Sequence, residues 1–190
     1  MKKKAKTKED YVIISPKVFG EKEIGLTMAS DPKLLIGREI ILSALELTEN
    51  VNKYYLKILF KINKVEGNKA FTEFHGAECL QDYISRMVVR RVRRIDTIQD
   101  VFTKDGIELR VKCICVVSRK AKGSIEKAIR KKIEEIIKQE VEAKNLDDFV
   151  RGLISDEIKT KIIEETKKIY PIKNFEIRKV EVLSTREKEQ

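Results

Sequence analysis

The sequence feature that most constrains the fold is a two-stranded pattern around an Asp-Gly pair. Apolar-rich runs at residues 95–103 and 107–118 flank Lys104, Asp105 and Gly106. Asp-Gly between two such runs favours a β-hairpin, because a type I′ turn needs positive φ at both central residues. One face of the second run is formed by Ile107, Leu109, Val111, Cys113, Cys115 and Val117. This alternation predicts a strand with one face in the core and Glu108, Arg110 and Lys112 on the other.

Residues 86–94, directly before the hairpin, contain five arginines and no acid. These arginines are Arg86, Arg90, Arg91, Arg93 and Arg94. The planar guanidinium matches phosphate oxygens, which makes a nucleic-acid backbone the first candidate partner. Asp82, Asp96 and Asp100 could instead pair with some of them, although surface pairs are worth only about 0–1 kcal/mol each. Because these acids are too few to neutralise the cluster, we expect it to bind phosphate.

The chain of 190 residues has a formal net charge of +10, and the excess is concentrated. Residues 81–122 carry eleven basic and five acidic side chains, whereas residues 123–170 are balanced, as solvated helix faces are. The same reasoning extends the candidate contacts to Lys2, Lys3, Lys4, Lys6 and Lys8 in the N-terminal tail, Arg119, Lys120 and Lys122 after the hairpin, and Lys173, Arg178 and Lys179 near the C-terminus. The tail lysines could equally serve only to solubilise the chain.

The periodicity of the remaining chain predicts an α+β fold. We expect strands at 11–14, 37–47, 54–65, 70–75 and 172–183, an ordered loop at 18–32, and a helix over about 78–91. Three further helices are expected to begin near Ser124, Asn145 and Ser155. The last strand changes parity, which predicts a bulge near Arg178 and Lys179.

The element order favours a mostly antiparallel sheet or partly closed β-barrel, with three C-terminal helices packed on one side and a returning C-terminal strand. The expected organisation is a basic tail at 1–10, disordered when free, a single domain at 11–183 and a polar tail at 184–190.

Residues suited to catalysis are scarce. The single histidine, His75, could join Cys79, Cys113 and Cys115 around zinc, but Cys-X-Cys spacing does not fit the usual two-residue knuckle. No Gly-rich phosphate loop or carboxylate cluster is evident. We therefore expect no catalytic residue, no metal and no cofactor. With 6% aromatics and no tryptophan, the chain favours recognition of folded RNA by charge and shape over base stacking.

Three long motifs carry a resemblance to a known family. They are Phe19-Gly20-Glu21-Lys22-Glu23-Ile24-Gly25 with Asp31-Pro32 and Leu35-Ile36-Gly37-Arg38, then Arg94-Ile95-Asp96 through Lys104-Asp105-Gly106 to Arg110-Val111-Lys112, and finally Lys168-Ile169-Tyr170-Pro171 through Leu183. Together they resemble the S-three-a-e family of archaeal and eukaryotic small-subunit ribosomal proteins. The chain departs from that pattern at Asp10-Tyr11, at Leu26 and Met28, which replace an acid and a proline, and at His75.

The resemblance implies a structural protein on the platform of the small ribosomal subunit, near the messenger exit and the 3′ end of the rRNA. Its partners would be small-subunit rRNA, neighbouring ribosomal proteins and mRNA near the exit channel, with no membrane and no small-molecule substrate. Arg38, within the first motif, joins the candidate rRNA contacts. The implied location is the cytoplasmic ribosome, which agrees with three cysteines in a reducing compartment, and the short polar end is archaeal in type.

Two other functions remain open at this point. A free RNA- or DNA-binding regulator would use the same basic surface away from the ribosome. A metal-dependent nuclease would need clustered carboxylates, which the sequence does not provide.

Overall fold

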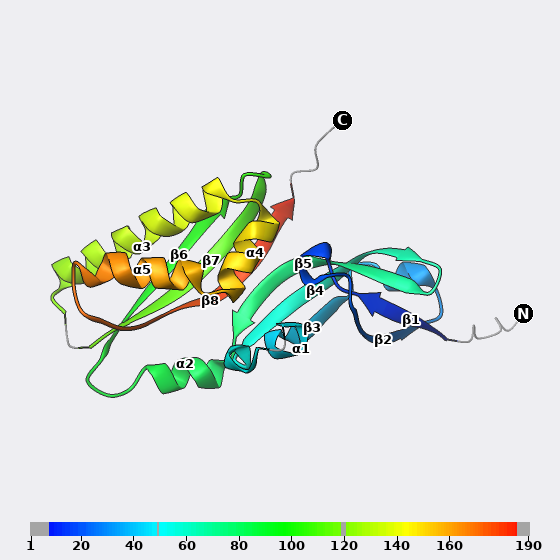
Figure 1. The fold of residues 1–190 in the computed structure, drawn as a ribbon, viewed down its shortest axis with the longest axis horizontal. Coiled ribbons are helices and arrows are strands. Elements are labelled where there is room, and N and C mark those ends of the chain that lie inside the picture. The colour runs from blue at the N-terminus through cyan, green and yellow to red at the C-terminus, as the bar shows by residue number, and fades with distance from the viewer. Residues whose placement is uncertain (1–7, 49, 119–120, 186–190) are drawn as a thin grey trace, which may run out of the picture. The chain divides into compact units, whose positions relative to one another are not determined.

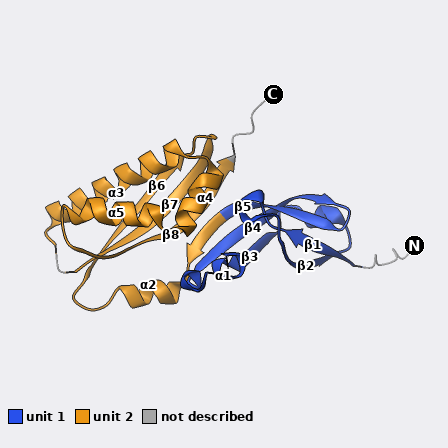
Figure 2. Ribbon diagram, viewed as in Figure 1, with its two compact units in different colours: residues 1–75 blue, residues 76–190 orange. Residues whose placement is uncertain are grey.

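The computed structural model of the protein describes residues 8–48, 50–118 and 121–185. These residues form eight strands and five α-helices, so the α+β prediction is confirmed. The strands make a mixed, unclosed sheet, which agrees with the open-sheet form of the prediction and not with a barrel. The chain divides into two compact units, residues 1–75 and 76–190 (Figure 2).

The first unit is built from strands β1 (Glu9–Ile14), β2 (Glu23–Ala29), β3 (Glu39–Ser43) and β4 (Leu56–Glu66), and most of β5 (Lys69–Cys79). β1 pairs antiparallel with β2 and parallel with β5, while β4 pairs with both β3 and β5. A short helix, α1 (Ala44–Thr48), follows β3. One cluster of its core consists of Tyr11, Ala29, Leu35, Ile62 and Ala70.

The second unit has an antiparallel sheet in the order β5, β8, β7, β6. Its strands are the end of β5, then β6 (Arg93–Phe102), β7 (Ile107–Val117) and β8 (Ile172–Thr185). β7 is the central strand, and every residue from Cys113 to Val117 is buried. The predicted hairpin and returning strand are therefore both present.

Three C-terminal helices cover one face of this sheet, as predicted. They are α3 (Gly123–Ala143), α4 (Leu146–Ile154) and α5 (Glu157–Lys167). α3 contacts β6, α5 contacts β8, and α4 packs on both helices (Figure 1). The apolar stripe of α3 is buried at Ile129, Ile133, Ile136, Ile137 and Val141, because a 3.6-residue period places these side chains on one side of the helix.

The turn of the β6–β7 hairpin differs from the predicted type I′. Only Gly106 has positive φ, at 80°, and the Gly106 N–H donates to the Thr103 carbonyl at 2.9 Å. This is a three-residue loop that ends on a left-handed glycine. The tip is held by the neighbouring helices, since Lys104 N–H donates to Lys144 O and Asp105 accepts from Leu146 N–H. These long-range contacts select a turn that the local pair alone did not specify.

Several boundaries also differ from expectation. The expected loop at 18–32 contains β2, whose pairing with β1 gives no side-chain signal because most of its side chains are exposed. The expected strand at 37–47 is β3 followed by α1. The helix at 78–91 is only α2 (Gln81–Met87), because β5 continues to Cys79 and the chain leaves the helix at Val88.

The helix starts and the bulge were predicted with mixed success. Asn145 is the N-cap of α4 as expected, whereas Lys122 and Asp156, not Ser124 and Ser155, precede α3 and α5. The bulge near Arg178 is confirmed, since Lys112 pairs with Lys179 and the next residue, Cys113, pairs with Ile177.

Candidate nucleic-acid interface

Three segments of the second unit meet at one end of its sheet. Val117, at the end of β7, pairs with Arg93 at the start of β6 and with Ile172 at the start of β8. Just beyond this row, the Ser118 N–H donates to the Pro171 carbonyl at 3.4 Å. The start of α3 lies at the same end (Figure 1). The start of β6, the end of β7 and the start of β8 are therefore neighbours in space, although they are far apart in sequence.

Four cations are placed at this end, and we call them the basic end: Arg90, Arg91, Lys122 and Lys173. All four are exposed. Within residues 8–48, 50–118 and 121–185, none of them has a carboxylate partner. Arg91 lies in the left-handed region with φ 68°, where the chain reverses from α2 into β6. Lys122 directly precedes α3, whose first N–H groups also favour an anion.

Arg86 is close to Arg90 and Arg91 in the sequence but belongs to helix α2. It lies in the last turn of α2 and is exposed. The alternative pairing of Arg86 with Asp82 does not form in the part of the chain that the structure describes. Arg86 therefore remains a candidate phosphate contact.

Two other arginines of the cluster are paired with acids. Arg93 Nε lies 2.7 Å from Glu126 Oε1 on α3, and its Nη2 donates to Oε2 at 3.2 Å. Arg94 Nε lies 2.9 Å from Asp96 Oδ1. The Asp96 pairing was foreseen as an alternative, whereas Glu126 lies 33 positions away and gives no local signal. A phosphate approaching these two side chains must compete with the carboxylates.

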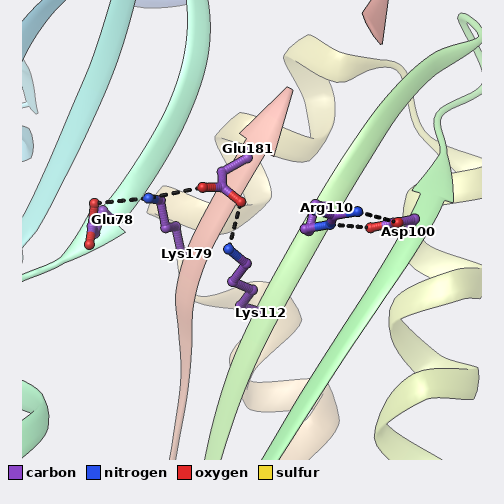
Figure 3. Close-up of polar contacts among 6 residues, drawn as sticks. All are labelled: Glu78, Asp100, Arg110, Lys112, Lys179 and Glu181. Carbon is purple, nitrogen blue, oxygen red and sulfur yellow. Dashed lines mark hydrogen bonds and ion pairs between the residues drawn. The ribbon is translucent and has the colours of Figure 1, made fainter. Parts of the chain in front are cut away.

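Lys179 belongs to a row of alternating charges that crosses the sheet on the face opposite α3, α4 and α5 (Figure 3). Its ammonium lies 2.9 Å from Glu181 and 3.5 Å from Glu78. The second carboxylate oxygen of Glu181 lies 2.7 Å from Lys112 Nζ. The hydrogen bond with Glu181 raises the pKa of Lys179, and bonds from Lys112 and Lys179 lower the pKa of Glu181. Arg178, one residue earlier, is half-buried in the bulge.

The remaining candidates are divided between the first unit and undescribed residues. Lys8 is exposed just before β1. Arg38 is exposed, and its guanidinium donates to Thr27 Oγ1 and, at 3.4 Å, to the Met28 carbonyl. The predictions for Lys2, Lys3, Lys4, Lys6, Arg119 and Lys120 lie outside the described residues.

One further cation fits the basic end but was not expected from the sequence. Lys167 is exposed and ends α5, and four residues separate it from the start of β8 at Ile172. The sequence could have indicated its position, since a basic residue shortly before Pro171 is typical of the last turn of a helix. Lys167 was not selected because the charges of residues 123–170 balance.

The cysteines serve as core residues. Cys79, Cys113 and Cys115 are buried and form no disulfide in the described part of the chain, and burial raises the pKa of Cys113 and that of Cys115, the latter to about 12. The described residues contain no group of three or more potential metal ligands. His75 Nε2 instead lies 3.4 Å from Glu39. Among the described helices, none is long and apolar enough to cross a membrane.

Comparison with known proteins gives a consistent result along the whole chain. The sequence pattern of the ribosomal S3Ae family matches residues 1–186. The protein named small ribosomal subunit protein eS1 of Methanothermobacter thermautotrophicus is 40% identical over 94% of this chain and 91% of its own length. Proteins of the same name from Methanopyrus kandleri and Saccharolobus islandicus are 38% and 37% identical, over 95% and 98% of this chain and 87% and 90% of theirs. The chain therefore belongs to the ribosomal S3Ae family.

Proposed function

We propose that this chain is a structural constituent of the small ribosomal subunit that binds rRNA phosphates through its basic end. The family is one of structural ribosomal proteins, so the chain is not an enzyme. The observation that carries the proposal is the convergence of Arg90, Arg91, Lys122 and Lys173 at one sheet end without carboxylate partners among the described residues.

The electrostatics of the basic end support phosphate as the ligand. Arg90 and Arg91 present rigid donor forks that suit phosphate oxygens, and the lysines add point charges around them. The acids that neutralise Arg93, Arg94 and Lys179 lie farther along the strands or on α3. Exposed cations held close together by a sheet and a helix can neutralise several phosphates of a folded RNA backbone.

The names of the relatives support the small subunit, and the family resemblance implies a more specific location. We propose that the chain contributes to the platform of the small subunit near the mRNA exit, where rRNA, neighbouring ribosomal proteins and emerging mRNA would be its partners. Arg86, Lys8, Arg38 and Lys167 are secondary candidates for rRNA contact, and the tail lysines remain part of the proposal.

Sedimentation tests the ribosomal placement directly. A tagged chain should comigrate with small subunits in a sucrose gradient of cell extract. It should also stay with them through a salt wash that removes loosely bound factors, because a constituent protein buries many contacts at once. A chain that stays at the top of the gradient would instead indicate the free RNA-binding regulator.

A further inference from the structure

The strand β2 lies at an edge of the sheet and exposes large apolar side chains. It pairs only with β1 among the described strands. Its residues Leu26 and Met28 are 71% and 62% exposed. They lie opposite Val12 and Asp10 of β1 and share one face of the ribbon. Exposed edges with apolar side chains are templates for pairing with another chain.

The backbone groups of Leu26 and Met28 point away from β1. The Val12 N–H donates to the Asn68 carbonyl, at 2.8 Å, on the β5 side of β1. In an antiparallel pair, a residue whose polar groups point away from the partner strand faces a residue that does the same. Leu26, opposite Val12, and Met28, opposite Asp10, therefore direct their N–H and C=O groups to the free edge. The Arg38 contact agrees with this direction, because its guanidinium donates to the Met28 carbonyl at 3.4 Å from outside the pair. A strand that pairs with Met28 must displace this long hydrogen bond.

The two strands of this ribbon and the chain between them are acidic, in contrast to the second unit. Residues 9–31 carry five acids and two lysines, and residues 76–190 carry a net +6. Arg38 places one cation at the edge itself, where it donates to the Met28 carbonyl. Asp10, directly opposite Met28, is exposed, and so is Glu23 at the start of β2. An RNA backbone would meet carboxylates here, and a second copy of β2 would bring the same acids together.

We propose that the free edge of β2 accepts an extended, basic segment of a neighbouring protein by strand addition. The backbone of the segment would pair with Leu26 and Met28, its apolar side chains would cover theirs, and its cations would face Asp10 and Glu23. Backbone pairing supplies the affinity in this mode and alternate side chains supply the specificity. The inference rests on the proposed ribosomal function, because the subunit is where such a neighbour is held nearby.

The test uses the full chain in small subunits with a photo-crosslinking side chain in place of Met28. It is prepared with Leu26 unchanged, with Leu26→Ala and with Leu26→Pro. Proline is tolerated where the lost N–H faces outward at an edge, so the β1–β2 pair should still form. Thermal unfolding of each free variant checks the fold. A crosslinker at Ile98, 60% exposed on β6, is the matched control.

With Leu26 unchanged, we expect a crosslink from position 28 to one protein, mapped to a segment with basic residues, and none of this product from Ile98. Leu26→Ala should lower its yield a few-fold. Leu26→Pro should lower it by about tenfold or more, because it also removes a backbone donor and places a ring at the edge.

Several results would overturn the inference. They are a crosslink only to rRNA or to a second copy, no crosslink in incorporated chains, a linked segment without basic residues, or a yield that Leu26→Pro leaves unchanged. Sedimentation of the same samples separates the two proposals, since a chain that enters subunits but does not crosslink contradicts strand addition alone. A chain that never enters subunits contradicts both.

Discussion

Arg110 donates two parallel hydrogen bonds to Asp100 across the β6–β7 hairpin, from Nε to Oδ1 at 2.7 Å and from Nη2 to Oδ2 at 2.8 Å (Figure 3). Both residues lie in the half of the hairpin nearer the turn and face each other in the register. The pair fixes the hairpin register on the face opposite α3, α4 and α5, and it occupies a guanidinium that would otherwise be available to RNA.

This pair predicts a defined pH dependence of stability. The hydrogen bonds from Arg110 hold the pKa of Asp100 below its usual 3.8. A carboxyl whose pKa is lower in the folded state stabilises the fold above its unfolded pKa, and this stabilisation is lost as pH falls through the folded value. We expect the melting temperature of Asp100→Asn to lie below that of the parent at pH 6 and to approach it as pH falls below 3.8. A difference that stays constant with pH would contradict the assignment.

Gly76 is expected to be intolerant of any side chain. A Cβ at this position would lie 2.5 Å from the Val180 carbonyl oxygen on β8, which is backbone and cannot rotate away. Gly76→Ala should therefore separate β5 from β8 and lower the free energy of unfolding by about 1–3 kcal/mol. Denaturant unfolding measures the change. Gly123→Ala is the control, since no atom lies within 4 Å of its Cβ, and equal effects of both variants would contradict this explanation.

Glu176 is a buried carboxylate held by two side chains. It is 4% exposed, accepts from Tyr83 Oη at 2.8 Å and pairs with Lys159 of α5. We expect Lys159→Met to destabilise the fold by about 2 kcal/mol, below the range for fully buried pairs because Lys159 is partly exposed. In a double-mutant cycle, Glu176→Gln should remove most of that effect. Lys131→Met, at a pair 4.0 Å apart on the surface of α3, should change stability by less than about 0.5 kcal/mol.

The cysteine thiols should be unreactive in the folded chain. Burial raises the pKa of Cys115 to about 12 and also raises that of Cys113, and the thiolate is the reactive form. Iodoacetamide at pH 8 should leave both thiols unmodified in the native protein and alkylate them after denaturation, as mass spectrometry would measure. Rapid alkylation of either cysteine in the native state would show that the strand opens or that the thiol is accessible.

Regular side-chain patterns were sufficient to predict most of the second unit. Alternation identified β7 and the hairpin, and the 3.6-residue period identified the buried stripe of α3. The parity change in β8 located the bulge at Arg178. In each case one face is buried, so apolar residues recur in the sequence with the period of the strand or helix.

The elements that were not predicted have no buried face that produces a regular apolar pattern in the sequence. β2 exposes most of its side chains and forms through backbone pairing with β1, which leaves no periodic signal. The α2 boundaries failed because Arg90 and Arg91 continue a helical pattern that the turn into β6 interrupts. The arginine cluster is evident in the sequence, yet the sequence could not show that Glu126 pairs with Arg93 or that β8 begins at the same end of the sheet as β6. Those are tertiary neighbours.

The salt dependence of rRNA binding by Arg90→Ala/Arg91→Ala tests the central claim most directly. Each lost phosphate contact should reduce the slope of log K against log salt by roughly 0.7–0.9, so about 1.4–1.8 for this double variant. The charge-matched control, Lys104→Ala/Arg151→Ala, removes an exposed cation from the opposite hairpin tip and one from α4 and should leave the slope unchanged. A reduced slope in the first variant alone supports phosphate binding at the basic end, whereas an unchanged slope there, or an equal loss in the control, would contradict it.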